Sequence, residues 1–383
     1  MKTSKDRYLT TFVGSLVRPQ KIQEYTQKIL AHEPYDEADY EATLKAEVAK
    51  VVKEEAATGL DVVSDGEFGK SSWTTYTMQR LAGFEVRTIP RPRVTYQGWD
   101  AENRFREYYA DRHSLPFRTA VCTGPISYTD EGRRQMQRDV DNFKAALKDV
   151  NVEEAFLPVV APCSIYVNYQ NEYYKSEEEF LFAVADALHE EYKIITDAGL
   201  IVQTDDAILA NLYDPITDSG QDYRKWAEMN LEALNHALKG IPEDRVRYHL
   251  CWGSWPGPHT TDVPLSDLVD LLIRVNAQAY SIEAANPRHA WEWKVWEDTK
   301  LPEGKVLLPG MISHAISHVE HPELIAQRIE QYAKVVGPEN VIASSDCGFA
   351  QGSGTARQHP SIAFAKLESL AEGAKIATAR RKK

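Results

Sequence analysis

The segment from Leu200 to Cys251 decides the fold. It begins with Leu200-Ile-Val-Gln-Thr-Asp-Asp-Ala207, continues through a helical stretch at 222–239, and ends with Arg245-Val-Arg-Tyr-His-Leu-Cys251. The first and last pieces are short and rich in β-branched or aromatic residues, whereas the middle piece has the pattern of an amphipathic helix. Two strands joined by a helix form a βα unit, and repeated units of this kind build a parallel sheet.

The same alternation extends to both sides of this segment. Counted without one irregular stretch, it provides eight strands, the number that closes a (β/α)₈ (TIM) barrel. A doubly wound open sheet is the alternative, but it needs a glycine-rich turn after its first strand. Val13-Gly14-Ser15-Leu16 offers a single glycine, so we predict an α/β protein with a TIM barrel. The expected strands are Tyr8–Ser15, Asp61–Glu67, Ala155–Cys163, Leu200–Ala207, Arg245–Cys251, Gln278–Ala284, Lys305–Ile312 and Val341–Cys347.

One stretch, Phe84–Tyr128, breaks the alternation after the second strand. It is rich in proline, arginine and tyrosine, and we expect an inserted hairpin or excursion there. The rest of the chain is consistent with a single barrel domain over residues 1–383. The arginines of the excursion could cover the barrel mouth, bind an anionic group or belong to an oligomer arm; they include Arg91, Arg93, Arg104 and Arg106.

The composition narrows the classes of function. A formal net charge of −13 over 383 residues argues against a protein that grips nucleic acid, since phosphate contacts need a basic surface. We find neither a signal-peptide core nor an apolar run that could span a bilayer. Four scattered cysteines do not make a disulfide framework, so we expect a cytoplasmic protein. Aromatic-rich loops on a long barrel favour a homo-oligomer.

Residues that could bind a soft metal ion fall where the expected strands end, which is where barrel enzymes place their chemistry. His249 and Cys251 end one strand, and the two-residue period of a strand turns them to the same side. Glu283 ends the next strand and Cys347 ends the last. One histidine, two thiolates and one carboxylate form a plausible zinc set, and the sulfur ligands argue against magnesium or calcium.

A displaceable carboxylate in this set would suit thiol chemistry. A substrate thiol could replace Glu283, lose its proton to metal coordination and become a nucleophile at neutral pH. Glu283 could equally cap a helix. We assign Cys122 and Cys163 to packing, because no second soft ligand accompanies either of them.

With these residues, the chain resembles the catalytic C-terminal barrel of the cobalamin-independent methionine synthase superfamily. The resemblance rests on His249-Leu-Cys251, Ile282-Glu283 and Asp346-Cys347-Gly348 in this order, and it covers nearly the whole chain. It implies a zinc-dependent methyltransferase, a transferase of methionine biosynthesis that acts on a thiol such as homocysteine.

The resemblance also implies roles at three other strand ends. Gly14 and Ser15 look like the turn that meets the thiol amino acid. Glu67 and Asp205 would hold the ammonium group of that amino acid through charge-assisted hydrogen bonds. Without the resemblance, each of these carboxylates is as well explained by helix capping or by pairing with an arginine.

The chain departs from the family at the acidic pair, where Asp205-Asp206-Ala207 replaces Asp-Glu-Pro, and in two further ways. The second, N-terminal barrel that helps to hold folate is absent, so the methyl donor is open: a methylated corrinoid, a corrinoid protein or a small methylated compound. The family ends its seventh strand with Gly-x-x-Asp-x-His, and this chain has Gly310-Met-Ile-Ser-His314. His314 is therefore the candidate catalytic proton donor, although strand alternation turns it to another face.

Two other functions stay open. Zinc could activate a thiol toward a non-methyl electrophile such as an epoxide, similar to the epoxyalkane–coenzyme M transferases. A thiol substrate that bears a sulfonate group would need an arginine to bind that group, and Arg18 is the evident candidate. A non-catalytic zinc site would instead have four firm ligands and no open position. A tryptophan cluster after Glu283 could form an apolar wall of the site or a subunit contact; it comprises Trp291, Trp293 and Trp296.

Overall fold

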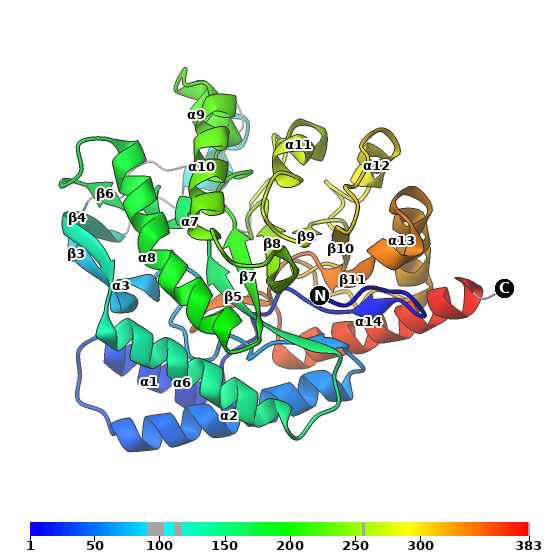
Figure 1. Cartoon of the computed structure of the whole chain (residues 1–383), viewed down its shortest axis with the longest axis horizontal. Coiled ribbons are helices and arrows are strands. Elements are labelled where there is room, and N and C mark those ends of the chain that lie inside the picture. Colours follow the sequence, from blue (N-terminus) through cyan, green and yellow to red (C-terminus); the bar gives the residue numbers. More distant parts are fainter. Residues whose placement is uncertain (90–102, 111–116, 168, 255–256, 382–383) are drawn as a thin grey trace.

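The computed structural model describes residues 1–89, 103–110, 117–167, 169–254 and 257–381. Its central feature is a sheet of eight strands in the order β1-β11-β10-β9-β8-β7-β5-β2, in which every described pair of neighbours is parallel (Figure 1). The strands are β1 Leu9–Thr10, β2 Val62–Val63, β5 Glu154–Val160, β7 Ile201–Asp206, β8 Val246–Leu250, β9 Ala279–Ile282, β10 Val306–Ile312 and β11 Ile342–Ser345.

The two end strands of this sheet meet and close the barrel. The amide of Asp61, next to β2, donates to the carbonyl of Thr10 in β1 at 3.1 Å. The amide of Thr10 donates in return to Oδ2 of Asp61 at 2.8 Å. All eight predicted strands are confirmed, each shorter than or close to its expected range. The open, doubly wound sheet is excluded by this closure.

Helices follow most of the strands and surround the sheet (Figure 1). Several begin at a side chain that accepts a hydrogen bond from the first turn: Asp36, Thr129, Ser176 and Asp222. Such caps satisfy amides that have no partner inside the helix. The longer helices are α1 Gln20–Leu30, α2 Glu37–Ala57, α6 Asp130–Leu147, α8 Glu177–Asp197, α10 Tyr223–Ala237, α13 Pro322–Val336 and α14 Pro360–Arg381.

Two helical expectations need correction. The sequence pattern at 264–276 predicts a helix, but the structure has a 3₁₀ turn there, Leu265–Asp267, followed by the short α11, Val269–Leu272. Helix α1 was not expected at all. It begins directly after Pro19 and buries Ile22 and Tyr25, so a short apolar stripe, rather than capping chemistry, holds it in place.

The barrel interior is polar beneath the strand ends. Arg247 of β8 is fully buried, and its guanidinium lies 3.8 Å from the centre of the Phe156 ring. Its terminal nitrogens donate to Thr11 Oγ1 and to the carbonyl of Phe12, both at 3.0 Å. These contacts tie β8 to the first strand and make a rigid floor for the cavity above.

The excursion is the hairpin predicted from the sequence, although it starts three residues earlier. Strand β3, Leu81–Ile89, pairs antiparallel with β4, Phe117–Tyr128, and the two-residue β6, Gln170–Asn171, extends the sheet. Figure 1 shows this sheet beside α8, at the edge of the barrel. Arg104 and Arg106 are exposed, whereas Arg91 and Arg93 lie outside the described residues.

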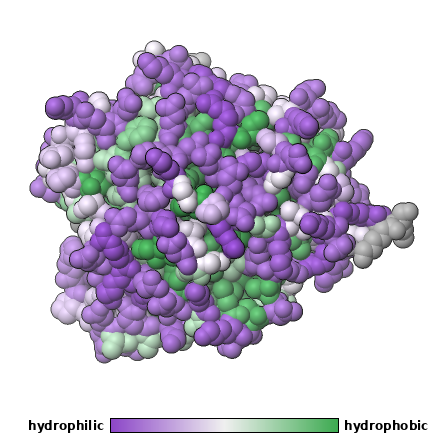
Figure 2. All heavy atoms as spheres, viewed as in Figure 1, coloured by the Kyte–Doolittle hydropathy of each residue, from purple (hydrophilic) through white to green (hydrophobic). Residues whose placement is uncertain are grey.

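The surface in Figure 2 is mainly hydrophilic, with hydrophobic residues in small, separate patches. Across the described ranges, no helix combines the length and the apolar character that crossing a membrane requires.

Candidate active site

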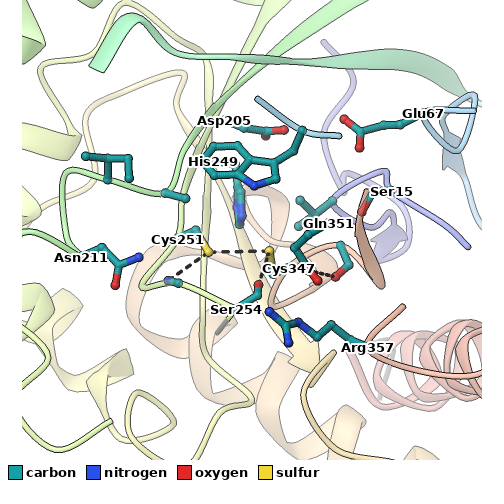
Figure 3. A pocket seen from close by; sticks show the side chains of 16 residues that line it. Ser15, Glu67, Asp205, Asn211, His249, Cys251, Ser254, Cys347, Gln351 and Arg357 are labelled. Atoms are coloured by element: carbon teal, nitrogen blue, oxygen red, sulfur yellow. Dashed lines mark hydrogen bonds between the residues drawn. The ribbon is translucent and has the colours of Figure 1, made fainter. Parts of the chain in front are cut away.

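A cavity of about 210 Å³ opens where the barrel strands end (Figure 3). Its wall is built from the segments that follow β1, β2, β7, β8 and β11, so residues far apart in the sequence meet here. This is the face at which barrel enzymes carry out their chemistry. The lining residues are Val13, Ser15, Glu67, Trp73, Asp205, Ala207, Ile208, Asn211, His249, Cys251, Gly253, Ser254, Cys347, Gly348, Gln351 and Arg357.

Three of the four predicted metal ligands form one cluster in this wall. The ligand atoms of His249, Cys251 and Cys347 all lie within 4.8 Å of one another. The two sulfur atoms are 3.6 Å apart. Two sulfurs bound to one tetrahedral zinc ion would be separated by about 3.8 Å, because each Zn–S bond measures about 2.3 Å. The spacing of the two thiols therefore fits one shared zinc ion.

The surroundings of these ligands fit a metal as well. Nδ1 of His249 lies 3.0 Å from Ser281 Oγ, while Nε2 is buried and has no hydrogen-bond partner. One ring nitrogen is thus oriented and the other is left free, which is how metal-binding histidines are held. The amide of Gly253 donates to the Cys251 sulfur at 3.2 Å, and the Ser254 hydroxyl donates to the Cys347 sulfur at 3.3 Å.

A hydrogen bond between the two thiols gives them different pKa values. Cys251 donates to the sulfur of Cys347, which lowers the pKa of Cys347 well below its usual range and raises that of Cys251. A thiolate is therefore favoured at Cys347 before any metal binds, and thiolates are the form that binds zinc.

The fourth predicted ligand, Glu283, lies at the edge of the cluster. Its Oε1 is 3.6 Å from the Cys251 sulfur and accepts the amide hydrogen of Trp252 at 2.9 Å. Its Oε2 accepts a hydrogen bond from Asn286 at 3.1 Å. The segment after Glu283 is held by Asp346, whose Oδ1 accepts the amides of Ala284 and Ala285 at 2.7 Å each. Glu283 is thus held at the cluster by other partners and could be exchanged for a substrate atom.

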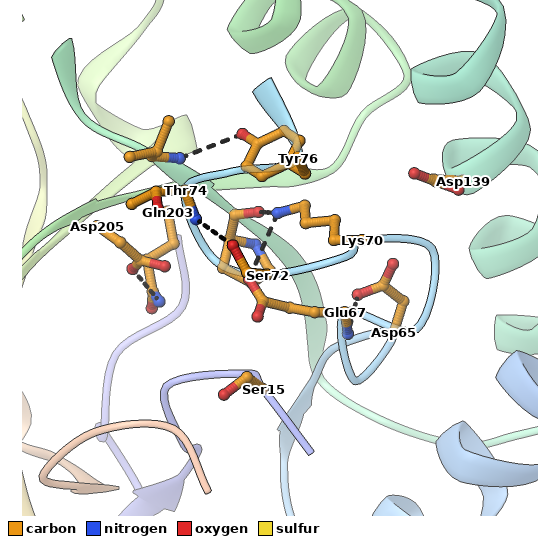
Figure 4. A network of polar contacts seen from close by, with 12 residues as sticks. Ser15, Asp65, Glu67, Lys70, Ser72, Thr74, Tyr76, Asp139, Gln203 and Asp205 are labelled. Carbon is orange, nitrogen blue, oxygen red and sulfur yellow. Dashed lines mark hydrogen bonds and ion pairs between the residues drawn. The ribbon is translucent and has the colours of Figure 1, made fainter. Parts of the chain in front are cut away.

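The two carboxylates expected to bind an ammonium group both line the cavity. Figure 4 shows Asp205 beside Gln203, whose amide donates to Oδ1 at 2.8 Å. Burial raises the pKa of Asp205 to about 7, and the negative charge of Glu67 contributes to this rise. A cation placed between these carboxylates would relieve both effects. Asp206 points elsewhere, since its Oδ1 accepts the amides of Ile208 and Leu209.

Glu67 is held more tightly than Asp205. Its two oxygens each face a cation at 3.4 Å: Lys70 on one side, as Figure 4 shows, and Arg18 on the other. Its backbone is in the left-handed region with φ of 60°, a conformation that is rare for a residue other than glycine. Strain of this kind persists where the surrounding structure requires it, and it is concentrated at functional sites.

Gly14 and Ser15 form the turn after β1. Gly14 has φ of 120°, and a Cβ there would lie 2.9 Å from Pro158 Cγ. Ser15 faces Gly348, where a Cβ would collide with the Ser15 hydroxyl. The carbonyl of Ser15 accepts the amide of Phe349 at 2.9 Å, which joins the first strand to the last. Glycine at 348 is therefore needed for the close approach of the segments after the first and last strands, and glycine at 14 is needed for its positive φ and its contact with Pro158.

His314 lies behind the cavity wall and does not line the cavity. Its ring is buried, and neither nitrogen has a hydrogen-bond partner. It interacts electrostatically with Cys347, which places it near the metal cluster. The tryptophan cluster is also outside the cavity wall: Trp296 is buried in the core and Trp291 is 53% exposed.

The arginine in the cavity is not the one that the sequence suggested. Arg18 is buried, and its guanidinium donates to Glu67 and to the carbonyls of Leu16 and Ala350, so it does not face the cavity. Arg357 lines the cavity and was not foreseen. It follows the short hairpin of β12, Ala350–Gly352, and β13, Thr355–Ala356, which has no helical or strand periodicity that points to a site.

This chain is similar to known methionine synthases in sequence and to a solved structure in fold. The methionine synthase of Thermococcus kodakarensis is 24% identical over 96% of this chain and 92% of its own length. That of Sulfurisphaera tokodaii is 25% identical over 96% and 91%. A B12-independent methionine synthase from a Shewanella species, solved in complex with selenomethionine, has the same fold, with a TM-score of 0.70 at 18% identity over 98% of both chains.

The family described as the cobalamin-independent synthase catalytic domain matches residues 8–91 and 118–373. The gap between these ranges falls within the β3–β4 hairpin, so the match includes every barrel strand and every residue of the cluster. The chain therefore belongs to the family of cobalamin-independent synthase catalytic domains.

Proposed function

We propose that this chain is a zinc-dependent methyltransferase that transfers a methyl group to the thiol of homocysteine or a closely similar amino acid. One observation supports this most: the soft donor set of His249, Cys251 and Cys347 opens into the same cavity as Asp205 and Glu67. A thiol amino acid needs a metal for its sulfur and carboxylates for its ammonium group. The relatives named methionine synthase support the same assignment.

Zinc would be held by His249, Cys251 and Cys347, with Glu283 as the displaceable fourth ligand. When bound, the metal keeps a coordinated thiol deprotonated and nucleophilic at neutral pH. Ser281 orients the His249 ring, and the donors at 253 and 254 stabilise negative charge on the two sulfurs. Outer contacts of this kind fix the ligands and tune their basicity.

Asp205 would be the main partner of the substrate ammonium group. Its carboxylate accepts one hydrogen bond within the described chain, from Gln203, whereas Glu67 already faces two cations. Glu67 would then shape the field around the ammonium group rather than bind it alone. Ser15 and Gly14 would contact the same end of the amino acid, since Ser15 lines the cavity next to Glu67.

In the reaction, the sulfur attacks the methyl carbon and forms the carbon–sulfur bond as the bond from that carbon to the leaving atom breaks. The electron pair goes to the leaving atom, which takes up a proton if it is basic. We assign this proton to His314, because its ring nitrogens are buried without partners close to Cys347. A bridging water or a side-chain rotation would carry the proton through the cavity wall.

The family description and the two cysteines of the metal cluster also bear on the methyl donor and on the cellular compartment. The family is described as cobalamin-independent, which counts against a corrinoid donor or a corrinoid-protein partner and favours a small methylated compound. We propose that residues 1–383 act as one catalytic domain in a reducing compartment such as the cytoplasm. Cys251 and Cys347 lie 3.6 Å apart, and both must stay reduced to bind zinc.

A second candidate function is alkylation of a thiol by a non-methyl electrophile such as an epoxide. Arg357 favours it, because a guanidinium in the cavity could hold the sulfonate of a thiol substrate. The acidic pair of Asp205 and Glu67 opposes it, since carboxylates repel a sulfonate and attract an amino acid.

The test is methionine formation by the zinc-loaded protein from homocysteine and a panel of methyl donors, followed by mass spectrometry. We expect one donor to give methionine with the wild type and none with Cys251→Ser. Cys122→Ser is the matched control, because Cys122 is a buried cysteine on β4 away from the cavity. Zinc and homocysteine binding without methionine from any donor would favour the second candidate function, and absence of zinc binding would contradict both.

A further inference from the structure

Arg357 is the one arginine among the residues that line the cavity, and its guanidinium has no hydrogen-bond or ion-pair partner in the described part of the chain. Its Nε is buried and unpartnered. Burial lowers the pKa of Arg357, since removing a charged group from water disfavours the charge. A half-buried guanidinium without a partner is costly for a protein to keep unless something else pairs with it.

The fully buried arginines of the same protein behave differently. Arg18, Arg80 and Arg247 each direct terminal nitrogens at oxygen atoms of the protein, in distances from 2.6 to 3.4 Å. The fold provides partners for the terminal nitrogens of those arginines, although their Nε atoms have none, like the Nε of Arg357. The terminal nitrogens of Arg357 have no such partner within the described chain, and these free donors face the space that a substrate would occupy (Figure 3).

The position of Arg357 is fixed by its backbone. Its amide donates to the carbonyl of Phe349 at 2.9 Å, which closes the β12–β13 hairpin onto the segment that carries Cys347 and Gly348. A guanidinium presented on such a support can offer two parallel N–H groups to one anion, the geometry that carboxylate, sulfonate and phosphate groups accept.

The arrangement of charges indicates which substrate would carry the anion. Figure 3 shows the carboxylates of Asp205 and Glu67 on one side of the two sulfur atoms and Arg357 on the other. The negative groups that act on Arg357 are the thiols of Cys347 and Cys251. The ammonium and carboxylate groups of an amino acid are bonded to the same carbon, so both stay near Asp205 and Glu67 when its sulfur is at the metal cluster.

We propose that Arg357 forms an anion-binding site for the alkyl donor, so that the donor is a small compound bearing a carboxylate, sulfonate or phosphate group. The inference rests on the proposed function, because the side of the cavity given to the acceptor follows from it. Arg357 would hold the donor with its reactive carbon toward the sulfur, and would select anionic donors over neutral ones.

The first experiment compares iodoacetate, an anion, with neutral iodoacetamide on the zinc-loaded protein with homocysteine. In both reactions the carbon–sulfur bond forms, the carbon–iodine bond breaks and iodide leaves with the electron pair, so no proton donor is needed. Mass spectrometry quantifies alkylated homocysteine, and the ratio of the two rates is divided by the ratio for free homocysteine. The variants are Arg357→Gln, Arg357→Lys and the control Arg380→Gln, a half-exposed arginine paired with Glu323.

We expect the wild type to prefer iodoacetate, and Arg357→Gln to lower this preference about tenfold, the size of one hydrogen bond to a charged group. Arg357→Lys should keep part of the preference, because lysine supplies a positive charge but lacks the two parallel N–H donors of the guanidinium group. Arg380→Gln should leave it unchanged. Zinc content and the Kd for homocysteine should be the same in all four proteins.

A second experiment needs neither zinc nor homocysteine. Methanesulfonate is titrated into the metal-free protein, and binding is followed by tryptophan fluorescence, since Trp73 lines the cavity. We expect binding to the wild type and at least about tenfold weaker binding to Arg357→Gln. This titration decides whether an anion site exists, whatever the outcome of the alkylation assay. Failure of the zinc-loaded protein to alkylate homocysteine would count against the proposed function and not against the anion site.

Three results would overturn the proposal. An unchanged preference and unchanged methanesulfonate binding in Arg357→Gln would mean that the guanidinium binds no anion. A weaker Kd for homocysteine, or Arg357-dependent binding of 2-mercaptoethanesulfonate with an unchanged alkylation preference, would place the anion on the thiol substrate. Loss of zinc alone would make Arg357 a counter-charge to the two thiolates.

Discussion

Two buried polar clusters in this protein differ in how their charges are matched. In the first, between α3, Thr77–Arg80, and helices α6 and α8, Arg80 donates to Asp139 and to Glu191 at 2.6 Å each. Arg138 adds a second cation on Asp139 at 2.8 Å. In the second, at the ends of the barrel strands, several buried atoms have no partner: His249 Nε2, both ring nitrogens of His314, Asp346 Oδ2 and Arg357 Nε. In the first cluster only the Nε of Arg80 lacks a partner within the described chain.

The difference separates stability from function. The first cluster (hereafter the ion network) is completed by the protein itself, so its removal should destabilise the fold. The second (hereafter the metal corner) is completed only by a metal ion and substrates, so its removal should abolish activity at little cost in stability. Polar groups left unpaired in a folded protein cost free energy, and a protein retains them where binding repays that cost.

The largest effect should come from the metal corner. Cys347→Ser should reduce zinc content to background and lower methyl transfer by about 10³-fold or more, because metal activation contributes several kcal/mol to such reactions. Zinc analysis of the purified variant and the methionine assay check this. The free energy of unfolding of the metal-free protein should change little; a variant that retained both zinc and activity would remove Cys347 from the site.

The next effect should come from the ion network. Arg80→Met should lower the free energy of unfolding by about 3–5 kcal/mol, because it leaves Glu191 buried without a cation and leaves Asp139 with Arg138 alone. Urea unfolding measures this. Arg133→Met, which breaks an exposed pair with Glu190, should cost less than about 1 kcal/mol. If Arg80→Met and Arg133→Met lowered the free energy of unfolding equally, burial of the ion network would contribute nothing to stability.

Within the metal corner, the two carboxylates should differ. Asp205→Asn should weaken homocysteine binding by about tenfold or more, since it removes one hydrogen bond to a charged group. Glu67→Gln should have a smaller effect, because Lys70 and Arg18 already neutralise Glu67. Isothermal titration of the zinc-loaded variants gives both Kd values; the reverse order would make Glu67 the principal ammonium ligand.

The smallest effect concerns pH. Burial raises the pKa of Asp139, but Arg138 and Arg80 outweigh burial and hold it below the ordinary value. A lowered pKa in the folded state gives stability that is fully present above the unfolded value, about 3.9, and is lost as pH falls below it. The difference in unfolding free energy between wild type and Asp139→Asn should therefore shrink from pH 6 toward pH 3. A constant difference would contradict this.

The sequence predicted the barrel and most of the site for the same reason. Apolar strands alternating with capped helices leave few other architectures, and the strand ends of a barrel converge on one face, so His249, Cys251 and Cys347 could be placed together. The roles of Glu67 and Asp205 could not be derived in that way. Their spacing in the sequence does not reveal that one faces two cations and the other a single amide.

Other features depend on contacts that no local pattern encodes. Arg18 and Arg357 are both arginines in loops, and only the fold shows that one is paired with Glu67 while the other faces the cavity. Strand alternation turned His314 away from the expected site, and in the structure its buried ring does not line the cavity. The alternation could not show that the ring still lies near Cys347, because β10 ends at Ile312. Helix α11 is shorter than the predicted stretch at 264–276 because a 3₁₀ turn occupies Leu265–Asp267 and the helix ends at Leu272.

Zinc-edge X-ray absorption with and without homocysteine tests the central claim most directly. We expect about one zinc ion per chain with two sulfur ligands in the resting protein, and a third sulfur replacing one oxygen ligand when homocysteine is added. That change would mean that the substrate thiol displaces Glu283 at a site built from His249, Cys251 and Cys347. A zinc ion whose ligands do not respond to homocysteine, or a protein that binds no zinc, would contradict the account.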